Sequence, residues 1–175
     1  MSNKIETEVH DNKHRGLEVG EIAPEWNLKG PDGKLIGLFR YFNQPLLMFF
    51  FRGTWCQSCL KQIEQIQDAW SEIEPLVQVV GIMRDSESRI NEYLAEGPLP
   101  FPLIADPSAK VIQLHNVYQR FGLNGFRIAY PTTIILDRNH IVRYCYVGLT
   151  QFDRPEISEV LAELHKLNAT SPKPN

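Results

Sequence analysis

Residues 46–59 read LLMFFFRGTWCQSC, and this stretch decides the fold. Its first six residues form a continuous apolar run of strand length, which is typical of a central strand covered on both faces. Two cysteines, Cys56 and Cys59, follow this run directly. Apolar residues then recur with a helical period, at Leu60, Ile63, Ile66, Trp70 and Ile73. The sequence therefore predicts a buried strand, a loop with two cysteines and an amphipathic helix that ends at Pro75.

The predicted start of that helix determines the chemistry of the cysteine pair. Backbone N–H groups at a helix N-terminus lack intrahelical partners, and the macrodipole adds roughly half a positive charge. Both features favour a thiolate and can lower a cysteine pKa from ~8.5 into the ~3.5–7.5 range. Cys56 stands first, at the exposed mouth of the loop, so we expect it to attack. Cys59 lies one turn inside and is expected to resolve the mixed disulfide, with Trp55 covering the exposed side.

The rest of the chain alternates strands and helices. Turn residues at Gly30-Pro31-Asp32-Gly33 predict a small hairpin within residues 23–38. Asp85 or Ser86 can cap a helix that ends near Gly97, Asp106 can cap one that ends near Tyr118, and Asp153 can cap the last helix. Further strands are expected at residues 76–83, 103–105, 132–136 and 141–147. This order indicates an α/β fold with a central mixed sheet flanked by helices.

One domain accounts for the 175 residues. Residues 1–16 and 168–175 are expected to be disordered tails on either side of a domain at residues 17–167. A net charge of -3 argues against nucleic-acid and anionic-membrane partners. No apolar run approaches the ~20 residues that span a bilayer, and the N-terminus lacks the apolar core of a signal peptide. We therefore expect a cytoplasmic protein.

Two other roles for the cysteine pair need to be weighed. A structural zinc site needs four ligands, but the sequence has no second CxxC and its five histidines are scattered, so no metal or cofactor is expected. Free cysteines can also pack as small apolar residues. In that case the domain is a redox-inert binding module. Cys145, in a predicted strand, is expected to be passive because its neighbours give no sign of thiolate stabilisation.

Four motifs together resemble a known family. They are Val19-Gly20-Glu21-Ile22-Ala23-Pro24, Gly53-Thr54-Trp55-Cys56-x-x-Cys59, Phe101-Pro102-Leu103-Ile104-Ala105-Asp106-Pro107, and Tyr130-Pro131-Thr132. On these motifs, residues 16–166 resemble the thioredoxin superfamily, and within it the AhpC/TSA redoxin branch. The resemblance implies a thioredoxin-like fold with an N-terminal hairpin and a peroxiredoxin-type insertion at residues 101–107. It also implies a cis peptide bond before Pro131, which lets the backbone of Tyr130 bind an extended substrate strand.

The resemblance implies two activities. Peroxiredoxins carry Pro-x-x-x-Thr-x-x-Cys, in which the threonine and a distant arginine polarise the peroxide O–O bond. With Cys59 on the peroxidatic cysteine, Cys56 takes the threonine position and Arg52 takes the proline position. The distant arginine falls at about Pro131. The main expectation is therefore a thiol–disulfide oxidoreductase that acts on a protein or small-molecule disulfide, with an external dithiol or disulfide as electron partner.

The alternative activity is that of a peroxiredoxin-like thiol peroxidase. Its peroxidatic residue is Cys59 or Cys56, and Arg52 and Arg127 are the basic residues that could replace the missing arginine. Fold lineage alone does not choose between the two activities, because one fold hosts many functions.

The proton acceptor for Cys59 is the role that the sequence leaves open. Thioredoxins keep a buried acid six positions before the first cysteine, and Phe50 stands there in this chain. Asp85, just after the strand predicted at residues 76–83, is the candidate acceptor, because related cytochrome-maturation proteins place a carboxylate near this position. Its alternative role is a helix N-cap.

Overall fold

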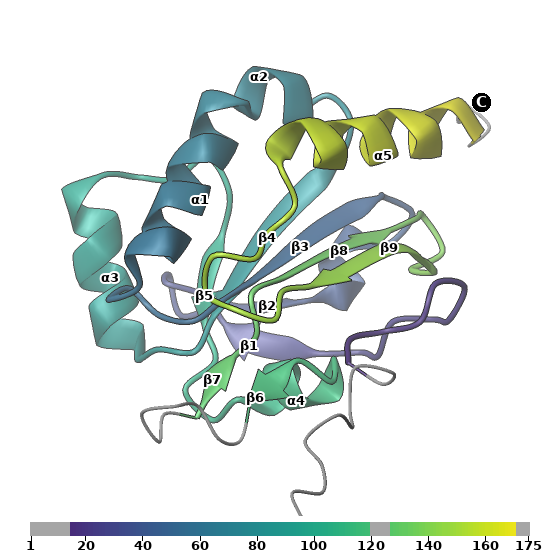
Figure 1. Cartoon of the computed structure of the whole chain (residues 1–175). Coiled ribbons are helices and arrows are strands. Elements are labelled where there is room, and N and C mark those ends of the chain that lie inside the picture. The colour runs from purple at the N-terminus through teal and green to yellow at the C-terminus, as the bar shows by residue number, and fades with distance from the viewer. Residues whose placement is uncertain (1–14, 120–126, 171–175) are drawn as a thin grey trace, which may run out of the picture.

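Strand β3 (Leu46–Phe51) is the centre of the fold, and all six of its residues are fully buried. The computed structural model describes residues 15–119 and 127–170. In it, β3 pairs in parallel with β4 (Gln78–Met83) and antiparallel with β8 (Thr132–Leu136). The complete sheet has the order β5 (Leu103–Ala105), β4, β3, β8 and β9 (Val142–Val147) (Figure 1). The predicted mixed sheet is confirmed.

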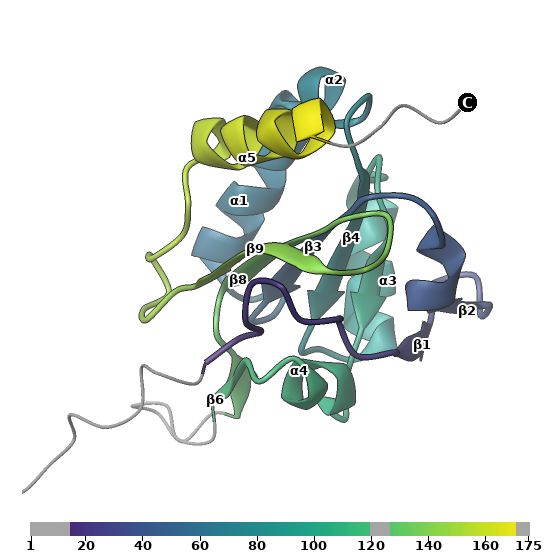
Figure 2. The same cartoon turned by 90° about the vertical axis from the view of Figure 1, so that its right-hand side faces the viewer.

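The side chains of β3 alternate between two cores, as the period of a strand requires. Leu47, Phe49 and Phe51 pack with helices α1 (Gln57–Asp68) and α5 (Ile157–Thr170). The short α2 (Trp70–Ile73) and α3 (Glu87–Glu96) also contribute to this core. Leu46, Met48 and Phe50 face the opposite core. Figure 2 shows α1 and α5 above the sheet and α4 below it.

The opposite core is closed by a hairpin and a short helix. The hairpin consists of β1 (Asn27–Lys29) and β2 (Leu35–Gly37), followed by a 3-10 turn at Leu38–Tyr41. The helix is α4 (Lys110–Leu114). Ile36 and Ile112 are among the residues that these elements bury. The hairpin predicted within residues 23–38 is therefore confirmed.

The segment after β5 differs from the prediction of a helix from Asp106 to Tyr118. Ala109 has a left-handed backbone, with φ 57°, so the helix begins only at Lys110. The Asp106 carboxylate still caps it from the loop, because it accepts the N–H groups of Lys110 at 2.9 Å and Ile112 at 3.0 Å. Beyond α4 the chain forms β6 (Tyr118–Gln119), which pairs with β7 (Ile128–Ala129).

The C-terminal helix also differs at both ends. It begins at Ile157, not at a cap on Asp153, because the Asp153 carboxylate accepts the Leu149 N–H and the Tyr146 hydroxyl instead. It continues to Thr170, so residues 168–170 are helical and not part of the disordered tail that was expected to begin at residue 168. Residues 1–14 and 171–175 of the predicted tails lie outside the described residues. No helix in the described ranges is long and apolar enough to cross a membrane.

Gly148 fixes the loop that joins β9 to α5. Its N–H donates to the carbonyl of Pro131 at 2.8 Å, and a Cβ atom added here would overlap the carbonyl oxygen of Asp153. The loop therefore approaches this position more closely than any side chain allows.

Gly148→Ala is expected to lower the free energy of unfolding by about 1–3 kcal/mol, because overpacking forces the backbone to shift. Urea denaturation measures the change. Gly97→Ala is the matched control, since nothing lies within 4 Å of a Cβ at that position. Equal stabilities of the two variants would contradict the close approach at Gly148.

Candidate active site

The two cysteines lie where β3 gives way to α1. Cys56 is the N-cap residue of α1, with an extended backbone, and Cys59 lies in the first turn of the helix. Both are free thiols, and the Cys59 Sγ donates a hydrogen bond to the Cys56 Sγ at 2.7 Å. The structure therefore brings the two predicted site residues into direct contact.

Cys56 is covered rather than exposed, which differs from the expectation of an open loop mouth. It is 3% exposed, and Cys59 is 0% exposed. Arg52 accounts for part of the cover, because its Nη1 lies 4.0 Å from the Cys56 Sγ and donates to the Gln151 Oε1 at 2.5 Å. Gln151 belongs to the loop between β9 and α5, so this loop is tied to the arginine that lies at the outer cysteine.

Guanidinium groups approach both sulfurs. Besides Arg52 at Cys56, Arg154 directs its Nη2 at the Cys59 Sγ at 3.2 Å. The backbone N–H of Arg52 also donates to the Cys59 Sγ, at 3.4 Å. No hydrogen bond joins Arg127 to either sulfur in the part of the chain that the structure describes. Of the two arginines named from the sequence, Arg52 therefore contacts the cysteine pair.

The sequence analysis missed Arg154, although a signal for it exists. Strand β9 is antiparallel to β8, which is antiparallel to β3, so β9 and β3 run in the same direction. Their carboxyl ends therefore meet at one edge of the sheet, where the cysteine loop begins. The loop after β9 carries Arg154 as its only cation, and this is the signal that the sequence holds. The sequence analysis predicted a mixed sheet but no strand order, so it could not place that loop near Cys56 and Cys59.

The surroundings set opposite protonation tendencies for the two thiols. The hydrogen bond from Cys59 is the main cause that lowers the pKa of Cys56, and despite burial this pKa falls to about 5 with help from Arg52 and Arg154. The same hydrogen bond, together with burial, raises the pKa of Cys59. This distribution favours Cys56 as the thiolate nucleophile and Cys59 as the protonated partner.

Asp85 anchors the cysteine loop to the end of β4. Its Oδ2 accepts the Thr54 N–H at 2.9 Å and the Thr54 hydroxyl at 2.8 Å. Burial raises the pKa of Asp85, but the hydrogen bonds from Thr54 and Ser86 and the charge of Arg89 lower it further than burial raises it. The N-cap of α3 is Ser86, whose side chain accepts the Arg89 N–H, and not Asp85.

No hydrogen bond joins Asp85 to either sulfur among the residues that the structure describes. A role as proton acceptor for Cys59 therefore stays a prediction.

Trp55 lies beside the pair as a partly exposed cover. It is 47% exposed, and the Arg52 guanidinium lies 5.2 Å from its ring centroid. This contact is of the cation–π type, and it holds Arg52 between the indole and the outer sulfur.

The prediction of a cis bond before Pro131 is wrong, because the described residues contain no cis peptide bond. A trans bond is the ordinary preference for X–Pro by about 0.5–1 kcal/mol. Tyr130 is also held in place on both sides of its backbone. Its N–H donates to the Val117 carbonyl at 2.8 Å, and its carbonyl accepts the Thr132 hydroxyl at 2.9 Å. These internal bonds occupy the groups that were expected to bind a substrate strand.

The pH dependence of Cys56 reactivity follows from its lowered pKa. Alkylation by iodoacetamide, followed by mass spectrometry at Cys56, is expected to be fast at neutral pH and to fall as the pH drops through about 5. The fall occurs because protonation removes the thiolate. Cys145, whose pKa burial raises, serves as the slow internal control. An inflection near the ordinary value of about 8.5 would contradict the described surroundings.

Asp85→Ala is expected to lower the free energy of unfolding by about 1–3 kcal/mol, because the Thr54 N–H loses its acceptor. Urea denaturation measures this loss. Asp85→Asn keeps an oxygen for that N–H and should be milder. Stopped-flow measurement of disulfide formation separates the predicted second role: a proton acceptor predicts slow resolution by Cys59 in Asp85→Asn, whereas an anchor alone leaves that step unchanged.

Comparison with known proteins agrees with this geometry. Residues 19–145 match the model of the AhpC/TSA family. The chain is 28% identical over 153 residues to the chloroplastic peroxiredoxin Q of Oryza sativa subsp. japonica, which covers 86% of this chain and 68% of that protein. It is 25% identical over 130 residues to the putative peroxiredoxin bcp of Coxiella burnetii, covering 72% of this chain and 85% of the relative.

Solved structures show the same fold. A cysteine-to-serine mutant of Xylella fastidiosa PrxQ has a TM-score of 0.76 at 18% identity, covering 89% of this chain and 98% of that chain. Peroxidoxin BcpB from Mycobacterium tuberculosis has a TM-score of 0.74 at 20% identity, covering 88% and 99%. The match to the family model covers more than half of this chain. The chain therefore belongs to the AhpC/TSA family of the thioredoxin superfamily and is an oxidoreductase.

Proposed function

We propose that the protein is a thiol peroxidase that reduces hydroperoxides, with Cys56 as the attacking residue and Cys59 as the resolving residue. The observation that carries the proposal is a low-pKa thiol already in contact with a second thiol, at an Sγ–Sγ distance of 2.7 Å, in a covered site. A small peroxide reaches a residue that is only 3% exposed more readily than a folded protein disulfide does.

The reaction proceeds in two steps on the protein. The Cys56 thiolate attacks one peroxide oxygen, the O–O bond breaks, and the departing alkoxide takes up a proton to leave as alcohol or water. Cys56 is then a sulfenic acid. The Cys59 sulfur attacks the Cys56 sulfur, forming a disulfide, and the hydroxyl leaves as water with the Cys59 proton. An external dithiol reduces the disulfide by exchange and becomes oxidised itself.

The relatives support a peroxidase, because those named above are called peroxiredoxins. The family threonine and arginine are replaced in this chain, so another group must polarise the O–O bond. Arg52 is the group that we assign to this task, since its guanidinium lies 4.0 Å from the Cys56 Sγ. The hydrogen bond to Gln151 and the stacking on Trp55 orient it there.

Disulfide exchange is the second candidate function. The observation that favours it is that Cys56 and Arg52 stand where peroxiredoxins carry threonine and proline, which leaves a thioredoxin-type CxxC. Against a protein substrate, the Tyr130 backbone groups that could bind a substrate strand are engaged with Val117 and Thr132.

Hydrogen peroxide consumption with dithiothreitol as the reductant tests the proposal. The unaltered protein should turn over repeatedly, and Cys56→Ser should lose activity entirely because the nucleophile is gone. Without dithiothreitol, Cys59→Ser should consume one equivalent of peroxide and retain a sulfenic acid at Cys56, which mass spectrometry detects. Cys145→Ser is the control and should behave as the unaltered protein does.

Two outcomes would overturn the peroxidase. Rapid reduction of a small disulfide with no peroxide consumed would establish thiol–disulfide exchange instead. A chain that reacts with neither oxidant, while its fold is intact by circular dichroism, would be a redox-inert binding module.

A further inference from the structure

We infer that Arg154 is a catalytic residue of this site. Its guanidinium stabilises the negative charge of the Cys59 sulfur while Cys59 attacks the oxidised Cys56. The inference rests on the proposed function, which makes a hydroperoxide the oxidant of Cys56. In a thiol–disulfide exchange, Cys59 would attack Cys56 in the same way. Arg154 does not accept the Cys59 proton, which leaves with the departing hydroxyl as water; the guanidinium stabilises the thiolate charge in a chain where Phe50 replaces the buried acid of thioredoxins.

Two contacts orient the guanidinium. The Nη2 of Arg154 lies 3.2 Å from the Cys59 Sγ, and its Nε donates to the Gln62 Oε1 at 2.8 Å. Gln62 lies on α1 three residues after Cys59, on the same helix face, and is buried. A planar guanidinium bound at two nitrogens by groups of one helix turn has little freedom to leave the sulfur.

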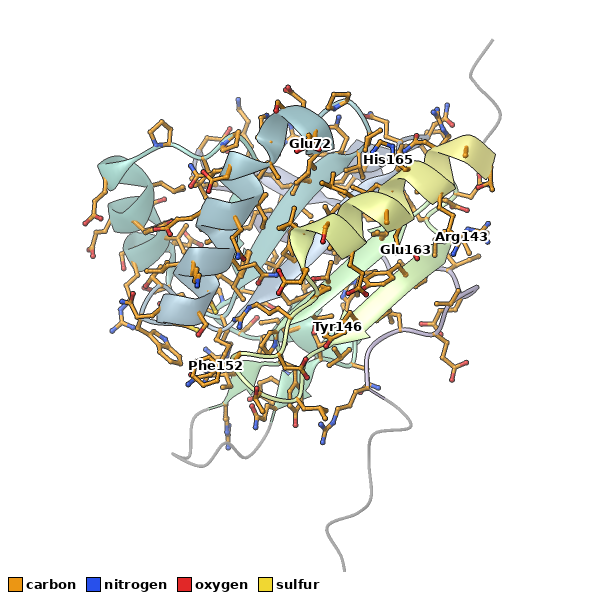
Figure 3. All side chains as sticks on the ribbon, turned by 45° about the horizontal axis from the view of Figure 1, so that its top comes forward. Glu72, Arg143, Tyr146, Phe152, Glu163 and His165 are labelled. Atoms are coloured by element: carbon orange, nitrogen blue, oxygen red, sulfur yellow. The ribbon has the colours of Figure 1, made fainter. Side chains whose placement is uncertain are left out.

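The loop that carries Arg154 is itself fixed. It runs from β9 past the start of α1 to α5 (Figure 1). Figure 3 labels two residues along this course, Tyr146 on β9 and Phe152 in the loop. Asp153, next to Arg154, accepts hydrogen bonds from the Tyr146 hydroxyl and from the Leu149 N–H, the latter at 2.8 Å. Arg154 therefore approaches the sulfur from a loop with a defined course.

Burial makes a cation necessary at Cys59. This residue is 0% exposed, so water cannot solvate a thiolate there, and a buried charge needs a partner. The Nη1 of Arg154 is also buried and has no hydrogen-bond partner among the described residues. In the reduced pair the Cys56 thiolate partly compensates the guanidinium charge. Once Cys56 is oxidised and neutral, an ionised Cys59 is the negative charge that pairs with the guanidinium.

Oxidation of Cys56 switches the balance. In the reduced pair, the hydrogen bond to Cys56, burial and the Cys56 charge all raise the pKa of Cys59. A sulfenic acid or a mixed disulfide at Cys56 carries no such charge. Burial of Cys59 then still raises its pKa, while the Arg52 N–H and the Arg154 guanidinium lower it. No carboxylate accepts a hydrogen bond from either sulfur in the described ranges. The charged side chain that contacts Cys59 is therefore Arg154, whereas the Arg52 guanidinium lies at Cys56.

Reaction with one equivalent of dithiobis-nitrobenzoate isolates this step without peroxide. The Cys56 thiolate displaces one nitrobenzoate thiolate and forms a mixed disulfide, and Cys59 then displaces the second. Both releases are read by absorbance in a Cys145→Ser background. Arg154→Gln should leave the first release nearly unchanged, and should slow the second about tenfold at neutral pH if the guanidinium shifts the Cys59 pKa by one unit.

The pH profile distinguishes charge stabilisation from a merely structural role. The slow second release of Arg154→Gln should recover as the pH rises, because the thiolate fraction of Cys59 then increases without the guanidinium. Arg154→Lys should restore part of the rate at neutral pH. Gln62→Leu keeps the cation but removes its 2.8 Å anchor, so it should fall between the unaltered protein and Arg154→Gln.

Arg143→Gln is the matched control, because Arg143 lies on β9 and pairs with Asp137 at 2.7 Å, and it should change neither release. An unchanged second release in Arg154→Gln, or a slowing that does not depend on pH, would overturn the inference. If Arg154→Gln fails to fold, Arg154→Lys and Gln62→Leu decide by the same pH criterion. If the protein does not consume peroxide but releases both nitrobenzoate thiolates as expected, the peroxidase proposal alone is overturned.

Discussion

The burial of the Cys59 sulfur is the constraint on which the active site depends. At 0% exposure, any charge on this atom must be balanced by protein groups, because water does not reach it. The protein supplies a backbone N–H from Arg52 and a guanidinium from Arg154 for that charge, while the hydrogen bond to Cys56 holds the neutral thiol in the reduced pair. These groups belong to the end of β3, the start of α1 and the loop after β9, so these three segments must keep their relative positions.

The sheet provides that fixed frame. Strand β3 is buried along its whole length and pairs with β4 on one side and β8 on the other, so its carboxyl end cannot move independently. Asp85, just beyond β4, ties the cysteine loop down through Thr54. Gly148, just beyond β9, ties the opposite loop to Pro131. Three strands that end at one edge of the sheet therefore hold the groups that surround the cysteines.

Sequence patterns predicted the elements with strong periodicity and missed what depended on tertiary contacts. The apolar run of β3, the hairpin of β1 and β2, and the pairing of β8 with β9 follow from local patterns. The left-handed Ala109 and the pairing of β6 with β7 carry no comparable local signal. The expected cis bond at Pro131 came from family resemblance alone, and the contacts of Tyr130 with Val117 and Thr132 accompany a trans bond.

The site shows the same division. The spacing of Cys56 and Cys59 and the helix that follows them predicted a contact pair, and the two sulfurs meet. The exposure of Cys56 was misjudged because it depends on tertiary contacts: Arg52 lies against its sulfur and is held by Gln151, almost a hundred residues later in the chain. Arg154 was overlooked for the same reason, since a side chain in a long loop has no periodic pattern that assigns it to a site.

The replacements relative to the peroxiredoxin motif are consistent with one another once the arginines are placed. The cysteine at the threonine position is the N-cap residue of α1, and in the proposed function it carries the reactive thiolate. In this chain, each sulfur has a guanidinium of its own, Arg52 at the outer one and Arg154 at the inner one. Separate cations allow the negative charge to lie on Cys56 before oxidation and on Cys59 after it, and this transfer is what a two-cysteine cycle requires.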